Sequence, residues 1–180
     1  MPNTWPLLLA AVLAAVPTVA LAAPHQATYT AKDKSWSVVY PASWEVTQSG
    51  DGRAVAFLAP PVRVAGTHFR PSVVVSSSTL DAGVTEDRVA EVARIAFESS
   101  LPRARLLGQE QAAARDGGRV LVLYYYVPPD RQAPGLYTVV GLALRRKLYT
   151  LVGTATTAVP DYRQQAARFR AIVLSLSATH

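Results

Sequence analysis

The sequence predicts an α+β fold, a single-domain α/β/α sandwich with a central, mainly antiparallel β-sheet flanked by helices. Strand-like segments follow one another through turn signals instead of alternating with helices, which is typical of antiparallel sheets. The runs 120–127 and 139–144 are apolar on both faces, so helices are expected on both sides of the sheet centre. With 180 residues, 50% of them hydrophobic, the chain can supply one well-packed core.

The first segment is predicted to be an export signal and not part of the fold. Residues 6–21 read PLLLAAVLAAVPTVAL without an ionisable side chain, and Ala20-Leu21-Ala22 follows the small-x-small cleavage pattern. This run is shorter than the roughly 20 residues of a membrane-spanning helix. The first five residues depart from the signal-peptide pattern, because they lack the Lys or Arg that usually precedes the apolar run. We expect a signal peptide over 1–22, a domain over 23–180, and a periplasmic or secreted protein, with an uncleaved anchor as the alternative.

The first half of the domain is predicted to consist of strands and turns. Ser49-Gly50-Asp51-Gly52 is a turn signal between two apolar runs, which predicts a hairpin. Prolines and an internal glycine indicate a loop over 60–71. The strands expected in this half cover 27–31, 36–40, 44–48, 53–58 and the β-branched run 72–80.

Two segments have the periodicity of amphipathic helices. Thr85 is a suitable N-cap for the first helix and Pro102 ends it, while Pro160 stands near the start of the second. The apolar stripes consist of Val89, Val92, Ala93, Ala96 and Ser100, widened by Ile95, in the first helix, and of Tyr162, Ala166, Phe169, Val173 and Leu176 in the second.

The segment between these helices predicts long strands. A turn at 116–118 separates 104–115 from Arg119–Val127, whose three successive tyrosines are interpreted as two core rings and one outward ring. A proline-containing loop follows at 128–135. Two similar runs, LYTVVG and LYTLVG, then flank Arg145-Arg146-Lys147 and predict a hairpin with a basic tip, because neither run could bury its face alone.

A family resemblance supports the same architecture. The segment Tyr40-Pro41-Ala42-Ser43-Trp44-Glu45-Val46 resembles the opening of PsbP/DcrB-like proteins, and the hairpin with Leu148-Tyr149-Thr150 and the last helix with Phe169 and Ser175 are similar too. The resemblance spans about 29–177 and implies an α/β/α sandwich without shared catalytic residues. Members of the family include thylakoid-lumen photosystem subunits, bacterial envelope proteins, a Ran-binding factor and chaperones for secreted toxins. Nothing in this sequence resembles the N-terminal region that is specific to the photosystem subunits.

Several chemistries lack their usual sequence signals. The chain has no cysteine and three histidines, and it contains no G-x-S-x-G elbow, phosphate loop or dinucleotide fingerprint, so no cofactor or metal is expected. The acidic residues Glu86, Asp87 and Glu91 fit helix capping better than catalysis. An enzyme would have to use His68 as a base with a serine among Ser76–Ser78, and we hold a small hydrolase or transferase as an alternative.

The expected function is therefore binding. We expect a non-catalytic exported binding or assembly protein of the bacterial cell envelope, with an envelope protein or an anionic envelope component as partner, peripheral membrane contact as an option, and no nucleic acid. The formal net charge of +6 favours anionic partners. A chaperone that shelters an apolar segment is the other alternative, and it predicts a concave, exposed apolar patch. The candidate binding surface comprises Trp44, Arg63, His68, Arg70, Arg131, Arg145, Arg146 and Lys147.

Overall fold

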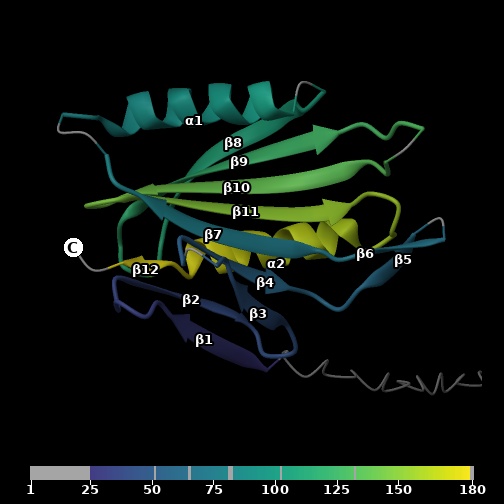
Figure 1. Ribbon diagram of the computed structural model, residues 1–180. Helices are drawn as coiled ribbons and strands as arrows, with labels where there is room; N and C mark the ends of the chain where they lie inside the picture. The colour runs from purple at the N-terminus through teal and green to yellow at the C-terminus, as the bar shows by residue number, and fades with distance from the viewer. Residues whose placement is uncertain are drawn as a thin grey trace, which may run out of the picture.

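A computed structural model describes residues 25–50, 52–64, 66–80, 83–101, 103–131 and 133–178. The predicted signal peptide lies outside these residues. Within them the chain forms a seven-stranded sheet with helix α1 (Glu86–Ser100) over one face and helix α2 (Tyr162–Leu174) over the other (Figure 1). The predicted α+β sandwich is therefore confirmed.

The large sheet has the order β3-β4-β7-β11-β10-β9-β8, and every neighbouring pair is antiparallel. A small sheet, β1-β2-β12, lies on the α2 side, and β5-β6 forms a separate hairpin. The strands are β1 (Gln26–Thr30), β2 (Trp36–Pro41), β3 (Glu45–Gln48), β4 (Ala54–Leu58), β5 (Val62–Val64), β6 (Thr67–Phe69), β7 (Ser72–Ser78), β8 (Arg105–Ala113), β9 (Arg119–Val127), β10 (Leu136–Leu144), β11 (Leu148–Thr156) and β12 (Ser177–Ala178).

Two elements differ from the sequence-based expectation. The segment predicted as a loop over 60–71 folds back on itself as β5 and β6, with Gly66 at a positive φ of 85° between them. The short strand β12 pairs with β2 through Ser177↔Ser37 and Ala178↔Trp36. These three strands have two or three residues each, too few for a periodic pattern to show, and each is paired with another strand.

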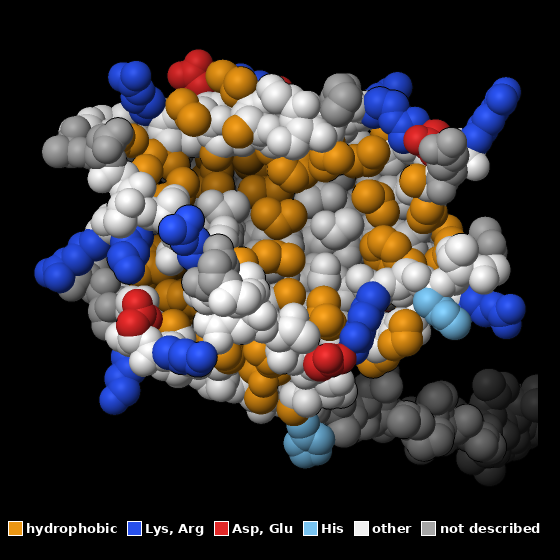
Figure 2. Space-filling view, in the orientation of Figure 1, with side chains coloured by type: hydrophobic (Ala, Val, Ile, Leu, Met, Phe, Trp, Pro, Cys, Tyr) orange, Lys and Arg blue, Asp and Glu red, His pale blue; other side chains and the backbone are white. Residues whose placement is uncertain are grey.

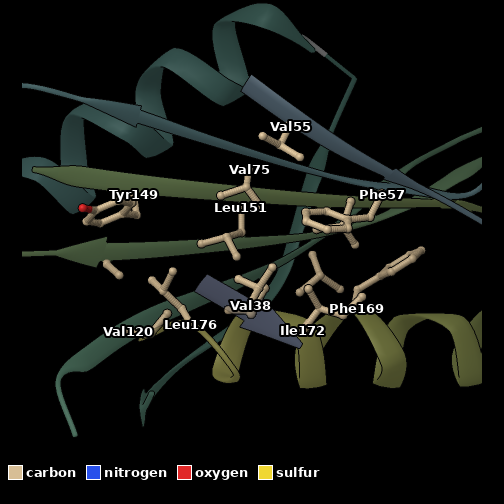
Figure 3. Close-up of a cluster of buried hydrophobic side chains, with 14 of the residues drawn as sticks. Val38, Val55, Phe57, Val75, Val120, Tyr149, Leu151, Phe169, Ile172 and Leu176 are labelled. Carbon is tan, nitrogen blue, oxygen red and sulfur yellow. The ribbon is translucent and has the colours of Figure 1, made fainter. Parts of the chain in front are cut away.

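The main core lies between the large sheet and α2 (Figure 3). Phe169, Ile172 and Val173 of the helix are fully or nearly fully buried against strand residues such as Leu151. The helix approaches the sheet at two glycines. An added Cβ at Gly141 would lie 2.4 Å from a methyl carbon of Val173, and one at Gly153 would lie 2.6 Å from the ring of Phe169. These are the last residues of the two similar runs, so the repeated motif forms a shallow seat for α2.

A smaller core lies under α1. Leu123, Tyr125, Val140 and Leu142 of β9 and β10 pack against one face of the helix, and the Tyr125 ring stacks on Phe97 with ring centroids 4.5 Å apart. Thr85 caps the helix as predicted, because its hydroxyl accepts the Arg88 amide hydrogen bond. Of the tyrosine run, Tyr125 is buried under α1 and Tyr124 is half-buried against the main core on the opposite face. Tyr126 is half-buried on the same face as Tyr124 and belongs to neither core.

Candidate functional site

Helix α1 covers only part of its face of the sheet. The helix packs over β9 and β10, whereas the cross-strand partners Val74 and Val152, farther along the same face, are only half-buried. Figure 2 shows hydrophobic side chains gathered on the sheet surface directly below the helix. One face of the sheet therefore carries apolar surface that its own helix does not bury.

The helix itself also exposes apolar side chains. Val92 is 58% exposed and Ile95 is 49% exposed, although both belong to the predicted buried stripe. Between α1, the loop before it and the start of β11 lies a groove of about 530 Å³, which we call the α1 groove. It is lined by Thr79, Leu80, Gly83, Val84, Arg88, Val89, Val92, Ala93 and Leu148. Contiguous exposed apolar surface of this kind marks interaction sites in soluble proteins.

Positive charge borders the α1 groove at one end. Arg88 lines the groove, and Arg146 is exposed on the β10–β11 turn. Arg119 lines a small adjoining cavity beneath the start of the helix, which it shares with Asp87. Lys and Arg side chains project from this end of the molecule, on the left in Figure 2. The rim would therefore favour acidic groups next to an apolar ligand.

The first residue of the predicted basic tip is part of the fold instead. Arg145 is 4% exposed and forms a bidentate ion pair with Asp116, which is 5% exposed, through hydrogen bonds of 2.9 and 3.1 Å. The remaining guanidinium nitrogen donates to the carbonyl oxygens of Arg119 and Leu144. Arg145 thus joins two turns at the same end of the sheet and is not available to a partner. Arg146 and Lys147 remain at the surface.

The environment of Asp116 explains how a buried carboxylate is tolerated. Burial alone would raise its pKa, but hydrogen bonds from Arg145 and from the amides of Ala178 and Gly118 outweigh this and lower the pKa to about 2. The Ala178 amide belongs to β12, so this carboxylate also holds the C-terminal strand. An added Cβ at Gly118 would lie 2.0 Å from the Arg145 guanidinium, so a larger residue here would displace this side chain from Asp116.

Trp44, one of the predicted binding residues, lines a second groove. The indole is 7% exposed and meets Phe169 edge to face, with ring centroids 6.1 Å apart. It forms one wall of a groove of about 370 Å³ between the β2–β3 turn and α2, opposite Arg168 and Ile172. The Tyr40-to-Val46 motif therefore connects the small sheet to the C-terminal half of the helix and leaves a cleft beside it.

The other predicted residues lie at the end of the sheet opposite Arg146. Arg63 and His68 are exposed cross-strand partners on the β5–β6 hairpin. Arg70 forms an ion pair with Glu45 and donates to the Ala59 carbonyl, and Arg131 is exposed in the β9–β10 loop. The nine residues of β10 separate this end from the β10–β11 turn, a span of roughly 30 Å. The eight candidates thus do not form one surface.

The structure does not assemble the catalytic pair that the enzyme alternative requires. His68 lies on the outlying hairpin, whereas Ser76 is paired in the middle of the sheet with Ala54 and Thr150. Within the described ranges, the His68 ring has no hydrogen bond to a serine or a carboxylate, and no group of three metal-ligating side chains occurs. In the same residues, no helix combines the length and apolarity that crossing a bilayer would require.

Sequence reasoning missed the exposed edge of α1, although a signal was present. Ile95 follows Ala93 by two residues, which places it about 200° further around the helix axis. Ala93 packs on the sheet, so Ile95 must point away from it. An apolar arc that wide cannot be buried by one sheet. The extra residues should have been interpreted as a second apolar face.

Comparisons with known proteins agree on the fold. No family model matches the chain, and no curated sequence does. Among solved structures, the cyanobacterial PsbP protein (CyanoP) of Synechocystis sp. PCC 6803 matches with a TM-score of 0.65 at 17% identity, covering 93% of this chain and 99% of that one. The Ran-binding protein Mog1p of Saccharomyces cerevisiae matches with a TM-score of 0.55 at 10% identity, covering 87% and 96%.

A protein of unknown function from Pseudomonas aeruginosa also matches, with a TM-score of 0.53 at 18% identity, covering 87% of this chain and 99% of that one. These identities are too low to carry function from one protein to another, because one fold serves many functions. They agree, however, with the resemblance seen in the Tyr40-to-Val46 motif. The chain therefore has a PsbP-like fold.

Proposed function

We propose that this protein is a non-catalytic exported binding protein of the cell envelope, and that its α1 groove holds an apolar segment of another envelope protein. The observation that carries the proposal is the 58% exposure of Val92, which lines a groove of about 530 Å³. Removing a large aliphatic side chain from water is favourable, and the buried face of α1 cannot do this for side chains on its exposed side. A bound partner would bury them.

The charge around the groove indicates the chemistry of the partner. Arg88 lines the groove, Arg119 shares the small adjoining cavity with Asp87, and the chain carries a net charge of +6. In the described residues, five acidic side chains are already held in ion pairs, those of Glu45, Glu98, Glu110, Asp116 and Asp130. The bound segment is therefore apolar along the groove and acidic at the end that meets Arg88.

Support for a binding role also comes from the fold relatives. The yeast protein with this fold is described as Ran-binding. The fold can thus present a surface to another protein, which supports the proposal without identifying the partner. The export signal predicted over residues 1–22 supports an envelope location in the same way.

A binding experiment with a defined peptide tests the groove. The probe is a fluorescein-labelled peptide with an apolar stretch of eight residues followed by three Asp, compared with the same peptide ending in three Lys. We expect the leaderless protein to bind the Asp peptide about tenfold more tightly at low salt, equivalent to about 1.4 kcal/mol, with the preference shrinking at high salt.

The matched variants are Val92→Asp and Ala167→Asp, which add the same charge at exposed positions on α1 and α2. Val92→Asp should weaken binding of both peptides, whereas Ala167→Asp should leave it unchanged. Equal affinities for the three proteins would refute the groove. Export is tested separately by N-terminal sequencing of protein from the periplasmic fraction, where we expect the chain to begin at Ala23.

A further inference from the structure

A third groove lies on the α2 side of the sheet, away from the α1 groove. Tyrosines from three elements meet there: Tyr126 of β9, Tyr137 of β10 and Tyr162 at the start of α2. Leu107, Thr157 and Arg163 complete a groove of about 560 Å³, within the range of sites that hold small ligands. We call it the tyrosine groove.

The aromatic wall of the tyrosine groove is held in place by packing. The rings of Tyr137 and Tyr162 have centroids 5.9 Å apart, and Tyr137 also meets Tyr124 at 6.5 Å. Behind them, the Tyr124 hydroxyl donates to Glu110, which in turn accepts from Arg170 of α2. This network fixes the inner ring, so the outer rings present a preorganised surface that loses little conformational entropy on binding.

A β-bulge adds an apolar side chain at the edge of the groove. The register between β8 and β9 shifts between Leu106 and Gly108, so Leu107 is the extra residue of the bulged strand. Its side chain is 57% exposed although the rest of the strand is paired. Bulges redirect side chains at functional sites, and this one directs a leucine toward a surface of tyrosines.

The charge in the groove limits what can bind. Arg163 donates from Nε to the Tyr162 hydroxyl at 3.2 Å, with the guanidinium carbon 5.9 Å from the centre of the ring. Its two terminal nitrogens have no hydrogen-bond partner among the residues described. The nearby carboxylate of Glu110 is neutralised by Arg170. The groove is therefore positive, which disfavours cationic ligands and favours a carboxylate.

The tyrosine side chains add apolar and hydrogen-bonding contacts to the positive charge of Arg163. A phenol ring offers a flat apolar face together with a polar hydroxyl, and burial raises the pKa of Tyr137, which keeps this hydroxyl in its neutral, donating form. A pyranose ring is complementary to such a wall, since its C–H groups stack on the rings while its hydroxyls accept and donate at the rim. We propose that the tyrosine groove binds a carboxylate-bearing saccharide, whose acid group pairs with Arg163.

The experiment uses the leaderless protein and isothermal titration calorimetry. The probes are trigalacturonate and its methyl ester, in which a methyl group on each acid removes the negative charge while the sugar rings stay the same. We expect the acid to bind and the ester to bind about tenfold more weakly. Arg163→Gln should lower the affinity for the acid by a similar factor and leave the ester unaffected. Arg168→Gln, an exposed arginine of the same helix that lines the Trp44 groove, should change neither affinity.

Tyr162→Ala should abolish binding of both saccharides, and an unchanged melting temperature would show that this variant is folded. Failure of both saccharides to bind the wild-type protein would overturn the proposal. Equal effects of the two arginine variants would overturn it as well. If the wild-type protein binds a proline-rich peptide more tightly than trigalacturonate, and Tyr162→Ala abolishes that binding, the tyrosine groove is a peptide site. This result would also refute the saccharide proposal.

Discussion

The close contact between α2 and the glycines of the sheet can be tested directly by a single substitution. Replacing Gly153 by alanine adds one methyl group where an ideal Cβ would lie 2.6 Å from Cγ and 2.7 Å from Cβ of Phe169. The Phe169 Cβ is fixed to the helix backbone, so a rotamer change cannot relieve the clash. Normal carbon–carbon contact lies at about 3.5–4.0 Å, and α2 must therefore move away by about 1 Å.

The expected cost follows from two opposing effects. Overpacking a closely packed core costs about 1–3 kcal/mol and sometimes more, and Phe169 is fully buried, which places this site at the upper end. Replacing glycine in a strand gains back roughly 0.5–1 kcal/mol, because alanine loses less backbone entropy on folding. We expect Gly153→Ala to lower the free energy of unfolding by about 2 kcal/mol, which corresponds to about 4–8 °C in melting temperature for a domain of this size.

Urea unfolding followed by circular dichroism measures this difference, with Gly108→Ala as the matched control. Gly108 also lies in a strand of the large sheet, but no heavy atom of the residues that the structure describes comes within 4 Å of its added Cβ. This control should be as stable as the wild-type protein or slightly more stable. Wild-type stability in Gly153→Ala, or an equal loss in both variants, would refute the close approach of α2.

Three further predictions concern buried polar groups. The buried Tyr125 hydroxyl has no hydrogen-bond partner among the described residues, so Tyr125→Phe should raise the free energy of unfolding by about 1 kcal/mol, measured in urea. A loss of stability in this variant would contradict the prediction. The pKa of Asp116 is lowered from 3.8 to about 2, so its stabilisation of about 2 kcal/mol is complete above pH 3.8 and disappears as the pH falls toward 2. The melting temperature of the wild-type protein should therefore fall as the pH is lowered from 5 to 2, and Asp116→Asn should make this fall smaller. At neutral pH, Asp116→Asn should lower the free energy of unfolding by about 3–5 kcal/mol, because Arg145 is left buried without its charge partner. Burial, and then the hydrogen bond to Glu110, raise the pKa of Tyr124 to about 12, so ultraviolet titration of Glu110→Gln should show one tyrosine ionising at lower pH than in the wild-type protein.

Much of the fold could be predicted because its signals are local. The strand β9 has the predicted bounds, Arg119–Val127, since an apolar run between a glycine turn and a proline has few other solutions. The β10–β11 hairpin follows from two runs that each need a partner. The N-cap at Thr85 needs only the residues that follow it. The α+β class then follows from the order of these elements.

The candidate surface was harder to predict, because burial depends on residues far apart in the sequence. Arg145 seemed to belong to a solvated tip, but Asp116, 29 residues earlier, lies within hydrogen-bond distance once both turns meet at the same end of the sheet. The tyrosine groove likewise combines side chains from β9, β10 and α2 that no sequence window contains.

The sequence alone determined the longer strands, the two helices and the excess of positive charge, since hydrophobic period, turn residues and ionisable groups are properties of neighbouring residues. Only the tertiary structure decided which arginine is buried, which face of α1 stays exposed and where the grooves lie. These outcomes depend on how the layers are placed against one another, and a small helix over a wide sheet inevitably leaves part of one face uncovered.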